Sequence, residues 1–329
     1  MTRRILIDTD TASDDAVALI MALVSPNVAI EAITVVAGNV PVEQATSNAL
    51  YVVELCAASV PVFQGAAGPL MRPLESADWF HGADGLGDHG YRPRALHPAP
   101  GDATDVIIRA VESNPGIEII TLGPLTNVAL ALLHRPDLPS KVGRCVVMGG
   151  GPCCEGNVTP ASEYNFWVDP EAARIVLRSQ LKIELVGWQL SRGPAIVNEQ
   201  EIDALLALRT PLAEFAVSCN SAAALAYEKQ TGEKGISLPD PTAMAVLLDP
   251  SVVLESSQHF IDVQTDSSIT RGMSVVDKLG VAGDARNRSV WHEVLTHGRK
   301  HSVIWQLDVP RWKQMLFAAL GSGPIRKAR

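Results

Sequence analysis

The sequence predicts an α/β protein with a doubly wound, mostly parallel open sheet of the Rossmann-like type and helices on both faces. Strand-like apolar runs alternate with helical patterns through the first two thirds of the 329 residues. The runs carry Ile and Val on both faces, as strands buried on both sides do. No internal repeat or low-complexity linker interrupts the chain, so we expect a single domain over residues 1–329.

The predicted elements alternate as strand and helix, beginning with a strand at 4–8 and a helix at 15–24. Four more strands are expected at 28–36, 117–122, 144–149 and 182–187. Four more helices are expected at 42–58, 102–113, 125–134 and 170–179. Right-handed crossovers through these helices would make the sheet parallel.

The last third of the chain departs from this alternation. A mainly helical insertion is expected from about 195 to 248. Short strands are expected near 259–265, 273–277 and 302–306, and a final helix near 309–320. The Pro- and Gly-rich stretch 65–101 is too long for a simple connection, which indicates a functional loop at the edge of the sheet.

Composition excludes several classes of protein. Hydrophobic residues make up 47% of the chain and charged residues 19%, which indicates a globular protein with a sizeable core. The net charge of −9 argues against nucleic acid or an anionic membrane as the main partner. We see neither a secretory signal nor an apolar stretch of membrane-spanning length. Five cysteines without a C-x-x-C pair fit reduced thiols, and we expect a cytoplasmic protein.

The clearest chemical signal is a group of four aspartates, Asp8, Asp10, Asp14 and Asp15, directly after the first predicted strand. The carboxyl ends of strands are where open α/β sheets bind ligands. Clustered carboxylates repel one another unless a cation lies among them or some take up protons. An all-oxygen site suits Ca²⁺ or Mg²⁺. An acidic helix start would account for one or two of these residues, so the four together favour a metal site.

Polar groups also follow the later strands. Asn39 comes after the second strand, and Asn157, Glu163 and Asn165 follow the Gly149-Gly150-Gly151 turn. Such groups can bind a polyol such as ribose, although loop capping would also explain them. Asp169 before Pro170 is expected to be a helix N-cap. Asp240, taken alone, is also more typical of an N-cap than of a metal ligand.

The chain resembles the inosine–uridine-preferring nucleoside hydrolase family in seven segments that occur in the family's order. The N-terminal segment is Asp8-Thr9-Asp10-Thr11-Ala12-Ser13-Asp14-Asp15-Ala16. The others are 36–39, the His-Gly-x-x-Gly-Leu-Gly loop at 81–87, 122–127, 148–150, 156–165 and 240–241, with 272–277 as weaker support. Together they cover residues 5 to about 245.

This resemblance implies Ca²⁺-dependent hydrolysis of the N-glycosidic bond of a ribonucleoside. By position, Asp10, Asp15 and Asp240 would be carboxylate ligands, and Thr126 would contribute its backbone carbonyl. Asp10 would also be the general base for the metal-bound water. Asp14, Asn157, Glu163 and Asn165 would hold the ribose hydroxyls, with Asn39 near the site. The family also suggests a homodimer or homotetramer.

One departure from the family concerns the leaving group. Well-known members carry His or Trp directly before the last metal-binding aspartate, whereas this chain carries Pro239, which cannot donate a proton. Activation of the leaving base must then use another group or be weak. The candidates for contact with the leaving base are Trp79, His81, Tyr164, Trp188 and Tyr227. The base preference, purine or pyrimidine, stays open.

Two other classes of function are considered beside the hydrolase. Asp8-x-Asp10 after a strand is superficially similar to the haloacid-dehalogenase phosphatases, but Gly283-Asp284 lacks the late acidic pair of that class. A catalytically weak nucleoside- or ribose-binding protein with a retained metal site is the other alternative, and Pro239 is the reason to consider it.

Overall fold

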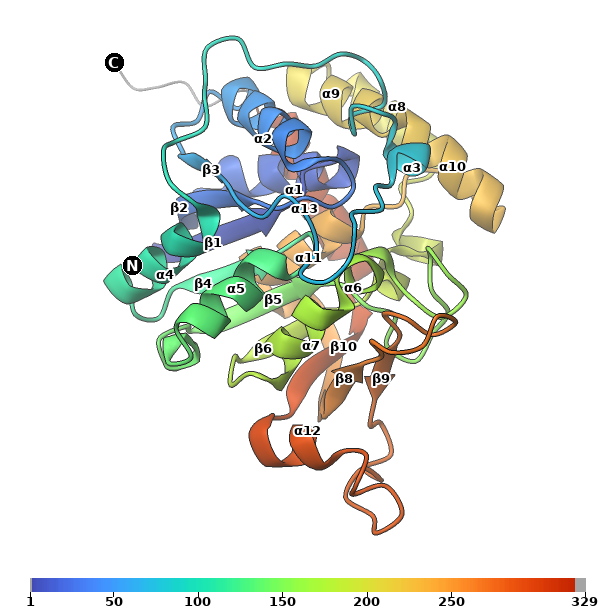
Figure 1. The fold of residues 1–329 in the computed structure, drawn as a ribbon. Helices are drawn as coiled ribbons and strands as arrows, with labels where there is room; N and C mark the ends of the chain where they lie inside the picture. Colours follow the sequence, from blue (N-terminus) through green and yellow to red (C-terminus); the bar gives the residue numbers. More distant parts are fainter. Residues whose placement is uncertain (1, 323–329) are drawn as a thin grey trace.

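The computed structural model describes residues 2–322 and has an eight-stranded central sheet with the strand order β3-β2-β1-β4-β5-β6-β10-β7 (Figure 1). Only β7 runs antiparallel to its neighbour β10. The strands are β1 (Arg3–Thr9), β2 (Val28–Val35), β3 (Val62–Gln64), β4 (Glu118–Thr121), β5 (Arg144–Met148), β6 (Ile183–Val186), β7 (Val253–His259) and β10 (His301–Leu307). A separate antiparallel pair joins β8 (Ile261–Val263) and β9 (Ser274–Val276).

Helices cover both faces of the central sheet, as the doubly wound class requires (Figure 1). One apolar cluster packs on the helices α1 (Ser13–Leu23), α2 (Val42–Leu55), α9 (Pro211–Cys219), α11 (Pro239–Leu248) and α13 (Val309–Gly321). The other packs on α4 (Ala103–Ser113), α5 (Thr126–His134) and α7 (Pro170–Arg178). The remaining helices are α3 (Asp78–His81), α6 (Tyr164–Val168), α8 (Glu199–Ala207), α10 (Ser221–Thr231) and α12 (His292–His297).

The predicted fold class is confirmed, and two of its strands need correction. Strand β3 was not expected, because it has only three residues and lies between Pro-rich segments. The strand expected near 259–265 is the shorter β8 (Ile261–Val263), and β7, which ends at His259, was not expected. The expected helical insertion is present as α8, α9, α10 and α11. Met1 and residues 323–329 of the expected domain lie outside the described residues.

Strand register brings distant segments to one edge of the sheet. Asp8 in β1 pairs with Thr34 in β2 and with Thr121 in β4. The chain segments that leave these three strands therefore start side by side at the same carboxyl edge. The long connection between β3 and α4 crosses this edge and carries α3 (Figure 1). Its Ala77 N–H donates to the Asn39 carbonyl at 2.9 Å, which ties the loop to the end of β2.

Within residues 2–322, the structure has no helix with the length and apolar character that crossing a membrane requires.

Candidate active site

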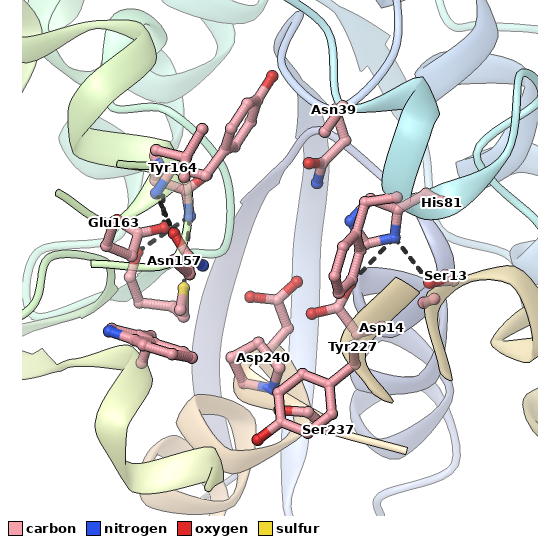
Figure 2. A pocket seen from close by; sticks show the side chains of 18 of the residues that line it. Ser13, Asp14, Asn39, His81, Asn157, Glu163, Tyr164, Tyr227, Ser237 and Asp240 are labelled. Carbon is pink, nitrogen blue, oxygen red and sulfur yellow. Dashed lines mark hydrogen bonds and ion pairs between the residues drawn. The ribbon is translucent and has the colours of Figure 1, made fainter. Parts of the chain in front are cut away.

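A pocket opens at the carboxyl edge of β1, β4 and β5, and its side chains come from segments between Ser13 and Asp240 (Figure 2). Its volume, including the open mouth, is about 740 Å³, which is within the range of small-molecule sites. The predicted residues that line it are Asp14, Asn39, Trp79, His81, Asn157, Glu163, Tyr164, Asn165, Trp188, Tyr227 and Asp240. The fold thus brings most of the predicted site together.

Asp10 is fully buried at the end of β1, and two glycines make room for its carboxyl group. A Cβ at Gly123 would lie 2.5 Å from Asp10 Oδ1, and one at Gly38 would overlap Oδ2. The Asn39 backbone N–H donates to Oδ2 at 2.7 Å. Among the described residues Oδ1 has no hydrogen-bond partner. A buried carboxylate oxygen without a donor fits a cation or water ligand.

Three further carboxyl groups meet at the start of two helices. Asp14, Asp15 and Asp240 each offer an oxygen atom within 4.8 Å of the others. Asp14 and Asp15 lie in the first turn of α1, and Asp240 lies in the first turn of α11. The positive ends of both helix dipoles therefore face these carboxylates. The interpretation of Asp240 as an N-cap is wrong, because Leu238 is the N-cap residue of α11 and Asp240 lies two residues inside.

Without a cation the carboxyl groups of Asp10, Asp14 and Asp240 all hold their protons to higher pH than an exposed aspartate does. Burial, and then the charge of Asp15, raises the pKa of Asp14 to about 7. The same two causes raise the pKa of Asp10 and of Asp240 well above the ordinary value. A divalent cation would reverse this by favouring the ionised forms. The ligand atoms are therefore all oxygens, and the carboxylates need a positive charge among them. Ca²⁺ or Mg²⁺ would supply it.

Asp8 does not belong to this group, although it is equally buried. Its Oδ1 accepts hydrogen bonds from Thr34 Oγ1 at 2.6 Å and from Asn127 Nδ2 at 2.8 Å. Burial raises its pKa to about 7. Asp8 joins β1 to β2 and to α5, so its function in the structure is to hold the strand ends together.

Glu163 organises the opposite wall of the pocket, where Figure 2 also shows Asn157 and Tyr164. It is the N-cap of α6, and its Oε1 accepts from the Asn165 backbone N–H at 2.7 Å. Its Oε2 accepts from the Gly150 N–H at 2.6 Å. Burial raises its pKa to about 7 despite these bonds. Glu163 thereby fixes the turn after β5 relative to α6.

Two neighbours of Glu163 complete this wall. Asn157 Oδ1 accepts from the Tyr164 N–H at 3.0 Å. Asn165 Nδ2 donates to the Leu122 carbonyl at 2.7 Å, and its Oδ1 is the group left for a ligand. These contacts orient both amides within a pocket that a polyol could enter.

Thr126 and Leu122, which lie in the same turn after β4, have different contacts. The Thr126 hydroxyl donates to Asp169 Oδ2 at 2.6 Å at the start of α5, and Thr126 is not one of the residues that line the pocket. Leu122 lines the pocket, and its carbonyl oxygen is the one bonded to Asn165. Asp169 is the N-cap of α7, as expected, through the Ala172 N–H.

The candidate base-binding residues have different surroundings. Trp79 lies at the pocket mouth with 57% of its surface exposed. His81 Nδ1 lies 2.8 Å from Ser13 Oγ, and burial lowers the pKa of its imidazole to about 3. The Tyr164 hydroxyl donates to the Glu75 carbonyl at 2.9 Å, which removes its proton from use in the pocket. Trp188 Nε1 donates to the Glu155 carbonyl at 2.7 Å, so only the indole ring faces a ligand.

Sequence reasoning missed one wall of the pocket, which we call the α10 wall. It consists of Asn220, Ala223, Tyr227 and Gln230, together with Ser237 in the turn after the helix. Only Tyr227 of these was a candidate. The spacing of three, four and three residues from Asn220 to Gln230 places the four on one face of a helix. That periodicity was the available signal, but it does not distinguish a pocket wall from a core face.

Comparison with known proteins agrees with this geometry. The family model described as inosine-uridine preferring nucleoside hydrolase matches residues 5–313. The pyrimidine-specific ribonucleoside hydrolase RihA of Salmonella gallinarum is 35% identical over 302 residues, which cover 91% of this chain and 96% of that protein. RihA of Shewanella baltica is 35% identical and covers 88% of this chain and 91% of its own.

Solved structures show the same similarity. A plant nucleoside hydrolase has a TM-score of 0.88 at 30% identity, covering 98% of this chain and 100% of that one. An inosine-guanosine nucleoside hydrolase has a TM-score of 0.84 at 30% identity, covering 97% and 99%. A purine-preferring ribonucleoside hydrolase from Gardnerella vaginalis has a TM-score of 0.84 at 27% identity, covering 97% and 98%. These relatives differ in the base they are named for, so base preference does not follow from the family.

Proposed function

Because this chain belongs to the inosine-uridine preferring nucleoside hydrolase family, we propose that it is a Ca²⁺-dependent enzyme that hydrolyses the N-glycosidic bond of ribonucleosides. The observation that carries the proposal is the set of carboxylates around Asp14, Asp15 and Asp240 beside the buried Asp10. The phosphatase alternative is set aside, because the family match spans residues 5–313.

Calcium is the ion that this donor set fits best, because Ca²⁺ accepts six to eight oxygen ligands in flexible geometry. Asp10, Asp15 and Asp240 would supply carboxylate oxygens. For the backbone ligand we propose the Leu122 carbonyl in place of that of Thr126, because the next residue, Gly123, lies against the Asp10 carboxyl group. When bound, the ion would lower the pKa of a coordinated water and orient the ribose diol.

Asp10 is proposed as the general base. Its Oδ1 has no donor among the described residues, as is also true of Asp8 Oδ2 and Asp14 Oδ1, so it can accept a proton from the attacking water. Asn39 holds the other oxygen, which fixes the carboxyl plane. A base within reach of its proton contributes about 10²–10⁴-fold to the rate.

The ribose would lie between Asp14 and the wall formed by Asn157, Glu163 and Asn165. Asn39 would lie beside it. Carboxylate and amide oxygens around the sugar would stabilise the positive charge that develops when the bond to the base breaks. The base would then extend toward the α10 wall, Trp188 and His81. We further propose that residues 1–329 form one domain and that the protein is a homodimer or homotetramer.

Release of ribose from a panel of nucleosides tests the proposal. The panel should include inosine, adenosine, guanosine, uridine, cytidine and nicotinamide riboside, each with Ca²⁺ and with a chelator. Chelator-sensitive release of ribose is the expected result. Nucleoside binding without release from any member would instead favour the binding-protein alternative.

A further inference from the structure

The α10 wall offers a ligand mainly hydrogen-bond acceptors, because most of its own polar protons already bind acceptors in the protein. The Tyr227 hydroxyl donates to Glu233 Oε2. The Ser237 hydroxyl lies 3.2 Å from the Ser191 carbonyl and 3.1 Å from Ser191 Oγ. Ser191 Oγ itself donates to the Trp188 carbonyl at 2.8 Å, so it accepts from Ser237. The hydroxyls of Tyr227 and Ser237 both use their protons on protein acceptors, and both residues line the pocket, so toward a ligand their oxygens can only accept.

Asn220 adds a third acceptor to the wall. Its Nδ2 donates to the Ser13 carbonyl at 3.2 Å and to the Ala216 carbonyl at 2.9 Å. Both partners are backbone carbonyls, which only accept, so the orientation of the amide is fixed. Its Oδ1 is fully buried and has no partner within residues 2–322. A buried oxygen of this kind calls for a donor from a ligand or a water.

Gln230 is the partial exception. Its Nε2 donates to the Asn157 carbonyl, which leaves one amide proton and the Oε1 lone pairs for a ligand. The wall therefore offers acceptors from Asn220, Tyr227 and Ser237 and a single free proton from Gln230.

The proton of Tyr227 is held by a charged network outside the pocket. Glu233 accepts it, and Arg192 Nε lies 4.0 Å from the same carboxylate oxygen. Arg192 also pairs with Glu155, and its guanidinium lies 4.7 Å from the centre of the Trp188 ring. The tyrosine proton is therefore held by the Glu233 carboxyl group outside the pocket, and Arg192 lies beside the same hydroxyl.

We propose that the α10 wall accepts hydrogen bonds from donors on the nucleobase. The enzyme would then favour bases with an exocyclic amino group over the corresponding bases with an oxo group. An amino group presents two protons to these acceptors, as in cytosine and adenine. A carbonyl oxygen in the same place, as in uracil and hypoxanthine, would face the acceptor lone pairs, and the adjacent ring N–H of these bases supplies one proton where the amino group supplies two. This inference rests on the proposed function, because it requires the ribose to lie at the carboxylates and the base at the α10 wall.

The matched pairs cytidine–uridine and adenosine–inosine test it, since each pair differs by exchange of amino for oxo with the accompanying shift of a ring proton. We expect kcat/KM to favour the amino member of the pair that is cleaved by at least about tenfold. Equal rates, or a preference for the oxo member, would overturn the inference while leaving the hydrolase intact. If no nucleoside releases ribose, the hydrolase proposal fails, and calorimetric affinities for the same pairs still test the wall.

A substitution outside the pocket can change the hydrogen-bond polarity of the Tyr227 hydroxyl without changing the shape of the α10 wall. In Glu233→Gln the new amide can donate to the Tyr227 oxygen, which allows the tyrosine proton to turn into the pocket. We expect the amino-to-oxo ratio to fall at least about threefold, and Tyr227→Phe to lower it as well. Lys234→Gln is the matched control and should keep the ratio, because Lys234 is next in the chain and, among residues 2–322, pairs only with Glu228 at the surface. A loss that is equal for both members would indicate a merely structural effect and would contradict the proposal.

Discussion

The carboxyl group of Asp10 occupies the space that a side-chain methyl would take at Gly38. Gly38 lies in the turn after β2, and Asp10 lies just beyond β1. The two strands are parallel neighbours, so their ends meet. The absence of a side chain at residue 38 is therefore part of how the proposed base is positioned.

Gly38→Ala should displace the Asp10 carboxyl and reduce turnover. A shift of about 1 Å in a catalytic group costs about 10²-fold, so we expect kcat to fall by about that factor. Gly68→Ala is the control, because a Cβ at Gly68 meets no atom within 4 Å and should leave kcat unchanged. Normal activity of Gly38→Ala would show that the position of Asp10 does not limit the reaction.

Asp10→Asn should lower kcat by about 10²–10⁴-fold, because an amide cannot take the proton of the attacking water. Asp8→Asn is a matched control in the same strand, since its Oδ1 can still accept from Thr34 and Asn127. Steady-state ribose release from both variants is the measurement. Activity of Asp10→Asn within about tenfold of the parent would exclude the residue as general base.

Calcium should stabilise the protein more strongly as the pH rises from about 5 to about 7.5. Burial raises the pKa of Asp14 to about 7, so without metal the folded state binds more protons than the unfolded state above the ordinary pKa near 4. Its contribution to stability is then lost as the pH rises from about 4 through about 7. Bound Ca²⁺ removes this loss, because it favours the ionised carboxylates.

Thermal unfolding with saturating Ca²⁺ and with a chelator measures this effect at each pH. The difference between the two Tm values should grow with pH across this window. A difference that does not change with pH would show that metal binding displaces no protons, and would contradict the assignment of these carboxylates.

Glu163→Gln should weaken both stability and ribose binding. Glu163 caps α6 with both oxygens, and its Oε2 also holds the Gly150 N–H; an amide can replace only one of these two acceptors. We expect a loss of about 0.5–2 kcal/mol, typical of a lost cap, together with a raised KM. Asn198→Ala removes the capping side chain of α8 and should lower stability while leaving KM unchanged. An unaltered KM in Glu163→Gln would show that the wall around Asn165 does not depend on it.

The sequence was sufficient for the fold and for the acidic part of the site, because buried strands and clustered aspartates leave strong local signals. It was insufficient where membership of the site depends on the direction in which a carbonyl or side-chain atom points. The choice between the carbonyl of Thr126 and that of Leu122 depends on how the turn after β4 is oriented. The side chains of Asn220 and Ser237 belong to the site only because α10 packs across the pocket, which no local pattern encodes.

The rate should depend strongly on how readily the base leaves without a proton. Pro239 cannot donate one, and the hydroxyls of Tyr164 and Tyr227 donate to Glu75 and Glu233 instead. Burial lowers the pKa of His81 to about 3, so its imidazole is neutral at pH 7 and is a weak acid. Nicotinamide riboside carries a cationic base that departs as a neutral molecule, so it should be cleaved at least about tenfold faster than uridine.

His81→Phe should slow uridine more than nicotinamide riboside if the neutral imidazole still assists. Equal rates for the two parent substrates would show that a proton donor is present in the pocket after all, or that a step other than bond cleavage limits turnover, and single-turnover kinetics would separate these two outcomes.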